Sequence, residues 1–220
     1  ISSDNHILAS ASDDRTVTLW NLQTGKRIYT FFGQAKEVHA VAISPDSQML
    51  ISGDFDSKIT RWNIAKKELI GTCFYLNLPT SHTGFIYSLA FSPDGEKFAS
   101  GSADKTIRVW SKSTGNIKRT LNGHTDAVRC VAITPDGNML VSGSCDRTIR
   151  VWDSNTGKPI HILNGHSGWV TSLAISPDGN NIISGSTDNT IKLWHLKTGE
   201  LIRTFSGHSS AILSVAISPD

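Results

Sequence analysis

The sequence lacks any long hydrophobic run. Its apolar runs are only a few residues long, such as Val131-Ala132-Ile133, against the ~18 needed to cross a bilayer. No basic stretch followed by an apolar one stands at the start, so no secretory signal is visible. We therefore expect no membrane partner. The chain also lacks an initiating Met and stops at Pro219-Asp220, so we expect both ends to be cuts through a longer protein, with flanking repeats or domains missing.

Excess charge and cysteine are also scarce. Lys plus Arg number 21 and Asp plus Glu 19, giving a net charge of +2 with no clustering of either sign. This disfavours nucleic acid as a partner, because phosphate binding needs a concentrated basic face. Cys73, Cys130 and Cys145 show no metal-ligand spacing, so we expect neither a metal nor a cofactor. Three free thiols favour a reducing, cytoplasmic location.

What the sequence does have is a repeat. Five tryptophans recur with spacings of 42, 48, 42 and 42 residues, and a Ser/Thr-Pro-Asp tripeptide and a Gly-His pair recur in the same phase. Between residues 134–152 and 176–194, eleven of nineteen positions are identical. The five tryptophans are Trp20, Trp62, Trp110, Trp152 and Trp194.

One unit reads as four short strands joined by turns. Residues 128–133 alternate and are rich in β-branched side chains, and Thr134-Pro135-Asp136-Gly137 is a strong turn. Strands over 139–143, 148–152 and 159–163 follow. Four antiparallel strands every ~40–45 residues predict the blades of a β-propeller, which pack face to face around an axis. The fold class is therefore all-β.

The spacing from Gly165-His166 through Ser176-Pro177-Asp178-Gly179 to Asp188 and Trp194 resembles the WD40 repeat, and the resemblance covers essentially the whole chain. It departs at the residue after the key Trp, where only Trp152-Asp153 is a true Trp-Asp pair. The repeat units run over approximately 1–42, 43–90, 91–132, 133–174 and 175–216, with 217–220 starting the next.

The number of blades in the ring stays open between two alternatives. The first residues supply the outer three strands of one blade, and residues 211–217 supply an innermost strand, so pairing them would close a five-bladed ring. In that ring His208 would meet Asp14, Ser10 and Trp20. The family resemblance implies seven blades, and we therefore favour part of a seven-bladed ring.

Three units repeat a His, a Ser, an Asp and a Trp at fixed spacing. A Ser, a His and an Asp suggest a hydrolase triad, but an active site occurs once, and no oxyanion hole or nucleophile elbow accompanies this set. We expect a structural network instead, which the WD40 resemblance also implies. Its members are His82, Ser100, Asp104 and Trp110; His124, Ser142, Asp146 and Trp152; and His166, Ser184, Asp188 and Trp194.

The unit that contains Trp62 departs from this pattern. Gln34 takes the place of the histidine opposite Ser52, Asp56 and Trp62. We expect Gln34 to donate a hydrogen bond to Asp56. We also expect the link between the loop and the turn to be weaker in this blade than in the others.

The residues of a candidate binding face differ from one repeat unit to the next, whereas the framework residues are nearly the same in every unit. In the WD40 family, partner contacts concentrate on the loops before the innermost strand and the turns between the second and third strands. Aromatic and arginine side chains there are typical hot spots. The predicted partner-binding residues are Trp169, Phe85, Tyr87, Arg129, His39 and Phe55, to which an apolar insertion before His82 adds Tyr75, Leu76 and Leu78. The alternative is that Phe85 and Trp169 only fill space between blades.

Three functions remain open. A non-catalytic scaffold that binds other proteins or peptides is the leading hypothesis. A propeller enzyme would need catalytic groups at the mouth of the central channel, where His39, Tyr87 and Arg129 form no recognised set. A purely architectural spacer would leave the residues of the face dispensable.

Overall fold

The structure, a computed structural model, describes residues 1–73 and 81–218, in which the strands form five antiparallel sheets. Sheet A contains β1 (Ile7–Ala11), β2 (Val17–Asn21) and β3 (Arg27–Phe31). Sheet B contains β4 (Val38–Ile43), β5 (Met49–Asp54), β6 (Ile59–Asn63) and β7 (Glu68–Thr72). Sheet C contains β8 (Ile86–Phe91), β9 (Lys97–Ser102), β10 (Ile107–Ser111) and β11 (Ile117–Leu121).

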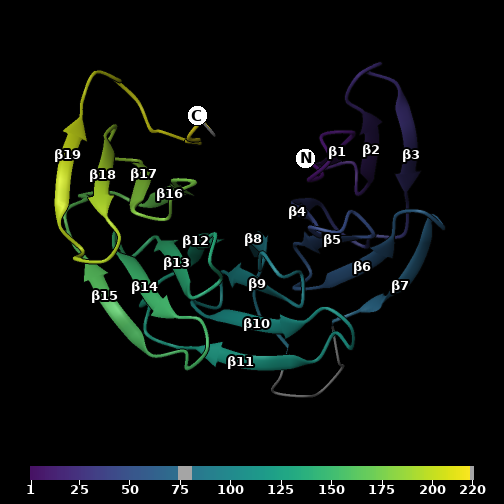
Figure 1. Ribbon diagram of the computed structural model, residues 1–220, viewed down its shortest axis with the longest axis horizontal. Helices are drawn as coiled ribbons and strands as arrows, with labels where there is room; N and C mark the ends of the chain where they lie inside the picture. Colours follow the sequence, from purple (N-terminus) through teal and green to yellow (C-terminus); the bar gives the residue numbers. More distant parts are fainter. Residues whose placement is uncertain (74–80, 219–220) are drawn as a thin grey trace.

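The last two sheets repeat this order. Sheet D contains β12 (Val128–Ile133), β13 (Met139–Ser144), β14 (Ile149–Asp153) and β15 (Pro159–Leu163). Sheet E contains β16 (Val170–Ile175), β17 (Asn181–Ser186), β18 (Ile191–His195) and β19 (Leu201–Phe205). In Figure 1 the sheets follow one another around an arc, with β4, β8, β12 and β16 innermost and β7, β11, β15 and β19 outermost. The predicted blades of a β-propeller are confirmed.

Local chemistry sets the limits of the strands. In sheet D, Thr134 Oγ1 accepts a hydrogen bond from Met139 N at 3.0 Å and donates to Asp136 Oδ1 at 2.5 Å, which closes the turn after β12. Gly137 takes a φ of 74°, a conformation that glycine adopts without strain. Pro159 opens β15 at the edge of the sheet, where a missing N–H leaves no ladder bond unmade.

The hydrophobic core lies between blades rather than within them. One cluster joins Val141 and Val151 of sheet D to Val170 and Trp194 of sheet E, and similar clusters join A to B, B to C and C to D. A Cβ placed on Gly143 would lie 2.5 Å from Val170 Cγ1, so only glycine permits this approach. Each blade is therefore stabilised chiefly by its immediate neighbours.

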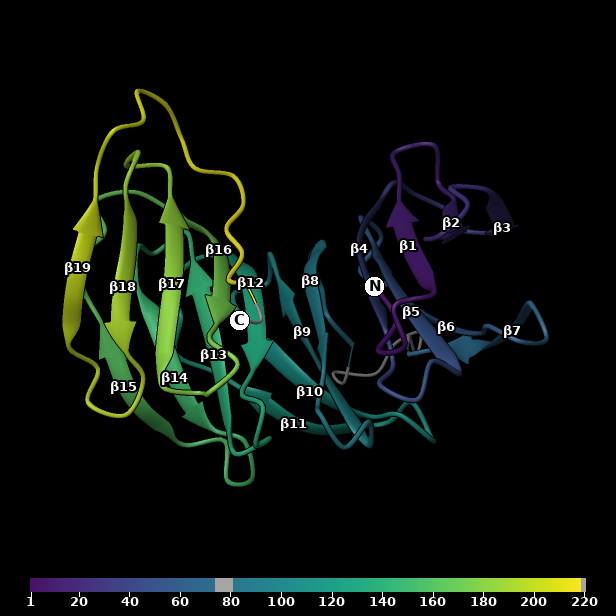
Figure 2. The same ribbon diagram turned by 45° about the horizontal axis from the view of Figure 1, so that its top comes forward.

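The arc is open. Figures 1 and 2 show a gap between sheet A and the segment that follows β19. Residues 211–217 lie against sheet E, where Ile212 N donates to Ser186 O at 3.0 Å, but they form no strand with β1 in the part of the chain that the structure describes. His208 is exposed, and among the described residues it forms no hydrogen bond with Asp14 or Ser10. No closed five-bladed ring is formed among the described residues, and the five-bladed and seven-bladed rings both remain predictions.

Candidate functional site

The repeated polar residues form the predicted hydrogen-bonded network. In sheet C, His82 lies 2.7 Å from both Asp104 Oδ2 and Ser100 Oγ, and Trp110 Nε1 donates to Ser100 Oγ at 2.8 Å. The Asp104 carboxylate can only accept, so His82 Nδ1 carries the hydrogen of a neutral imidazole and donates it to Asp104 in a hydrogen bond. Ser100 Oγ accepts the indole N–H and donates its own hydrogen bond to His82 Nε2.

Two further copies share this geometry. Both tie the loop between two blades to the turn inside the next blade. They consist of His124, Ser142, Asp146 and Trp152, and of His166, Ser184, Asp188 and Trp194.

Burial and hydrogen bonding fix the charge states in this network. Burial alone would raise the pKa of Asp104, but hydrogen bonds from His82 and Thr106 outweigh it and hold the pKa well below its usual range. Burial lowers the pKa of His82, although its bond to Asp104 opposes the change. The His82 side chain is 0% exposed and Ser100 is also 0% exposed, so no substrate can reach the pair. This burial favours a structural role over a catalytic one.

The prediction that Gln34 donates to Asp56 is wrong. Gln34 Nε2 donates to Ser52 Oγ instead, and Thr60 Oγ1 donates to Gln34 Oε1 at 3.3 Å. The Asp56 side chain is 50% exposed and lies 3.9 Å from Lys58 Nζ. The amide of Gln34 pairs through its nitrogen with Ser52 and through its oxygen with Thr60, and not with the Asp56 turn.

A residue that the sequence did not single out holds this turn. Asp54 is fully buried, and its Oδ1 accepts hydrogen bonds from Asp56 N at 2.9 Å and Lys58 N at 3.0 Å. Burial raises the pKa of Asp54. Its signal in the sequence is the aspartate at a position where the other units have serine, as in Ser102 and Ser144.

The predicted binding face owes its geometry to a β-bulge in each innermost strand. The ladder shifts between Val38 and Ala40, between Ile86 and Ser88, and between their equivalents in sheets D and E. An extra residue at a bulge has no ladder partner, and its side chain is re-aimed. The residues at these bulges are His39, Tyr87, Arg129 and Thr171.

A backbone hydrogen bond places a second pair of residues beside each bulge. Phe55 N donates to Glu37 O at 3.1 Å, and Ala103 N donates to Phe85 O at 2.9 Å. Each bond joins the turn between the second and third strands to the loop before the innermost strand. The loops of this face are therefore held at fixed positions.

Five of the predicted partner-binding residues meet in one continuous row, here called the aromatic strip, which consists of His39, Phe55, Phe85, Tyr87 and Arg129. The rings of His39 and Phe55 stack with centroids 4.1 Å apart, and those of Phe55 and Phe85 stack at 4.3 Å. Phe85 meets Tyr87 edge to face at 6.3 Å, and Arg129 Cζ lies 4.2 Å from the Tyr87 ring centre. The row crosses sheets B, C and D.

The remaining predicted contacts lie outside this row. Trp169 is 51% exposed, and its backbone N–H donates to Thr187 Oγ1 at 2.8 Å, which holds the loop in place. Asp13, which was not among the predicted contacts, extends the strip, since its Oδ1 lies 3.5 Å from His39 Nε2. Tyr75, Leu76 and Leu78 lie outside the described residues.

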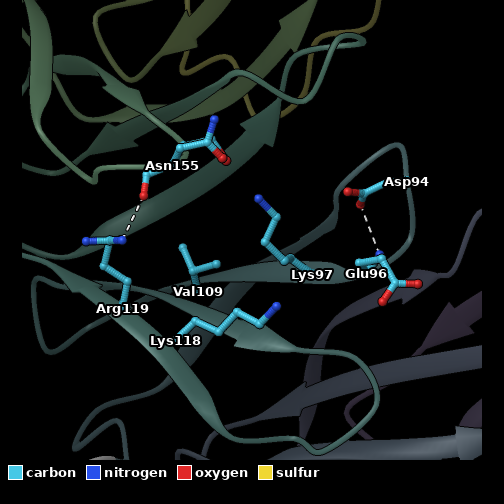
Figure 3. A pocket seen from close by; sticks show the side chains of 8 residues that line it. Asp94, Glu96, Lys97, Val109, Lys118, Arg119 and Asn155 are labelled. Atoms are coloured by element: carbon cyan, nitrogen blue, oxygen red, sulfur yellow. Dashed lines mark hydrogen bonds between the residues drawn. The ribbon is translucent and has the colours of Figure 1, made fainter.

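A hollow of about 450 Å³ lies at the opposite ends of the blades, between sheets C and D (Figure 3). It is lined by charged side chains, including Asp94, Lys97 and Lys118, while Arg119 donates to Asn155 O at 2.7 Å.

Across residues 1–73 and 81–218, no group of three or more His, Cys, Asp or Glu side chains could hold a metal ion, and no helix is long and apolar enough to cross a membrane.

Comparisons with known families agree with this architecture. The family model described as the TEP-1 second beta-propeller matches residues 43–220, and that of the WD domain, G-beta repeat, matches residues 1–21. A comparison with curated proteins gives no match. Since the first model spans most of the chain and the second covers the start of it, the protein belongs to the β-propeller family built of WD40 repeats.

Proposed function

We propose that this protein is a non-catalytic scaffold that binds another protein or a peptide on the face carrying the aromatic strip. Propellers of the WD40 family commonly mediate protein–protein interactions and are generally non-catalytic. The observation that carries the proposal is the row from His39 to Arg129. Its five residues stand at positions that differ between repeat units, and they contact one another across three blades.

The exposure of the rings supports a binding role over a packing one. Phe85 is 43% exposed and Trp169 is 51% exposed, although buried sites for aromatic residues exist between the blades, as Phe98 and Trp110 illustrate. Aromatic and arginine side chains with a solvent-facing surface contribute most of the free energy in many interfaces. A spacer would gain nothing from holding such groups in water.

The enzyme alternative finds less support. Burial raises the pKa of Cys73 to about 11 and that of Cys130 to about 12, which disfavours a thiolate nucleophile at either position. In the strip, His39 stacks on Phe55, and Tyr87 is covered by Arg129. Neither arrangement resembles a base beside a nucleophile.

Quantitative affinity capture tests the proposal. The wild-type chain is compared with a Phe85→Ala, Trp169→Ala variant and with Lys118→Ala, which changes an exposed residue of the outer strand β11. We expect proteins captured by the wild type to be lost with the double variant and retained with Lys118→Ala. Capture that depends on Lys118 and not on the two aromatic residues would assign binding to another surface.

A further inference from the structure

Arg129 differs from the arginines that tie neighbouring blades together. Arg61 Nη1 donates to Lys112 O at 3.1 Å, and Arg119 donates to two backbone carbonyls at 2.7 Å, so these side chains hold the framework. Arg129 lies at the bulge of β12 and is half-buried. Among the described residues, no hydrogen bond or ion pair of its guanidinium is found, and its contact is with the Tyr87 ring.

The ring of Tyr87 leaves the guanidinium prepared for an anion. The cation–π contact with Tyr87 uses none of the guanidinium N–H donors in a conventional hydrogen bond, so they remain able to bind an acceptor. The guanidinium fork matches the two oxygens of a carboxylate, and a prearranged arginine loses less side-chain entropy on binding. Arg129 therefore offers the strip a site for one carboxylate.

Apolar contact lies a short distance away. The step from the Phe85 ring to Tyr87 is 6.3 Å and that from Tyr87 to the guanidinium is 4.2 Å, so Phe85 and the charge of Arg129 are at most about 10.5 Å apart. Three residues of extended chain span about 10 Å. One short peptide can reach both groups.

We infer that the partner is an extended peptide that places a carboxylate side chain on Arg129 and a large apolar side chain against Phe85, within three residues of each other. This rests on the proposed function and names the chemistry of its partner. Phe85 stacks on Phe55 and is 43% exposed, which favours an aromatic or aliphatic side chain at this end of the peptide.

Selection from a phage-displayed library of random dodecapeptides tests the inference. The baits are the wild-type chain, Arg129→Gln, Arg129→Glu and, as a matched control, Arg203→Gln, which changes an exposed arginine of the outer strand β19. We expect wild-type and Arg203→Gln baits to enrich Asp or Glu within three positions of a large apolar residue. Arg129→Gln should lose the acidic residue, and Arg129→Glu should replace it with Lys or Arg.

A synthetic peptide from the wild-type selection then gives the magnitude. Its affinity should fall about 10- to 100-fold with Arg129→Gln, the range for losing a hydrogen-bonded charge, and stay unchanged with Arg203→Gln. Circular dichroism and the melting temperature of each bait report on folding, and we expect them to match the wild type because a bulge residue has no ladder partner.

The outcomes separate this inference from the proposed function. Acidic enrichment that persists with Arg129→Gln, or wild-type peptides that need Phe85 and carry no acidic residue, would overturn the role of Arg129 and leave the scaffold standing. Peptides insensitive to both Phe85→Ala and Arg129→Gln, or a selection without enrichment, would overturn both.

Discussion

At the scale of single residues, the repeated network distinguishes a histidine from the glutamine that replaces it. The imidazole of His82 forms hydrogen bonds with both Ser100 and Asp104, whereas the amide of Gln34 bonds to Ser52 and not to the aspartate of the turn. The turn of sheet B then depends on Asp54, which binds two backbone N–H groups of its own turn. In this turn the carboxylate of Asp54 alone thus takes the place that a serine and an aspartate share in the other units.

Two aspartates at equivalent positions should consequently differ in their effect on stability. Asp146 accepts hydrogen bonds from His124 and Thr125 N at 2.7 and 3.0 Å, so Asp146→Ala leaves the buried His124 donor unpaired and should cost about 1–3 kcal/mol. Asp56→Ala should change the free energy of unfolding by no more than about 0.5 kcal/mol. Urea unfolding measures both. Equal losses at the two positions would contradict the network described.

The same network predicts a dependence of stability on pH. Burial lowers the pKa of His82 and His166, so the folded protein keeps them neutral while the unfolded chain takes up protons near the ordinary pKa of 6.5. Stability should therefore fall as the pH drops below 6.5. The pKa of Asp104 is lowered by its hydrogen bonds, so a further loss should follow as the pH falls below its ordinary value of 3.8.

Urea unfolding between pH 7.5 and 5, a window of about 2.5 units around the histidine pKa, measures the first effect. His82→Gln, which copies the glutamine that occurs naturally at position 34, removes one of the titrating groups and should give a shallower decline than the wild type. An equally steep decline would show that His82 does not contribute to it.

At the scale of strands and sheets, the close approach of blades is set by glycine. A Cβ on Gly143 would lie 2.5 Å from Val170 Cγ1 and 2.7 Å from Cys130 Sγ. Gly143→Ala should push sheets D and E apart and cost about 1–3 kcal/mol. In that background Val170→Ala should cost less than it does in the wild type, because it makes room for the new methyl group. A double-mutant cycle with no coupling would refute this contact.

The strands themselves could be predicted from the sequence to within a residue, as 139–143 and β13 (Met139–Ser144) illustrate. Alternating β-branched residues and Pro-Asp-Gly turns are local signals. The bulges were not predicted, because a shift such as that between Val128 and Cys130 depends on how two strands pair. The stacking of Phe55 on Phe85 was not foreseen either, since it needs the angle between two blades.

At the scale of the whole molecule, the five sheets form an arc in which sheet A and the segment after β19 do not meet (Figure 1). Residues 211–217 occupy the place of a next innermost strand, since a Cβ on Gly185 would lie 2.6 Å from Ile212 Cγ2. The contact surface between blades therefore continues past the last sheet.

Two histidines at repeat-equivalent positions test the open arc. His124 is buried in its network, so His124→Ala should cost about 1–3 kcal/mol. His208 is exposed, and His208→Ala should change the free energy of unfolding by no more than about 0.5 kcal/mol. A loss at His208 as large as that at His124 would mean that the chain closes on itself in solution and that His208 meets Asp14.

The bulges of the innermost strands separate positions that pair within a sheet from positions that do not. Ladder positions such as Val128 and Cys130 must satisfy the sheet, while Arg129 between them is free of that demand. Thr171 differs from the other three bulge residues, since its Oγ1 donates to Gly185 O at 3.0 Å. Libraries confined to residues 39, 87 and 129 should therefore vary the surface of this face at little cost in yield, which makes the propeller a scaffold for directed evolution.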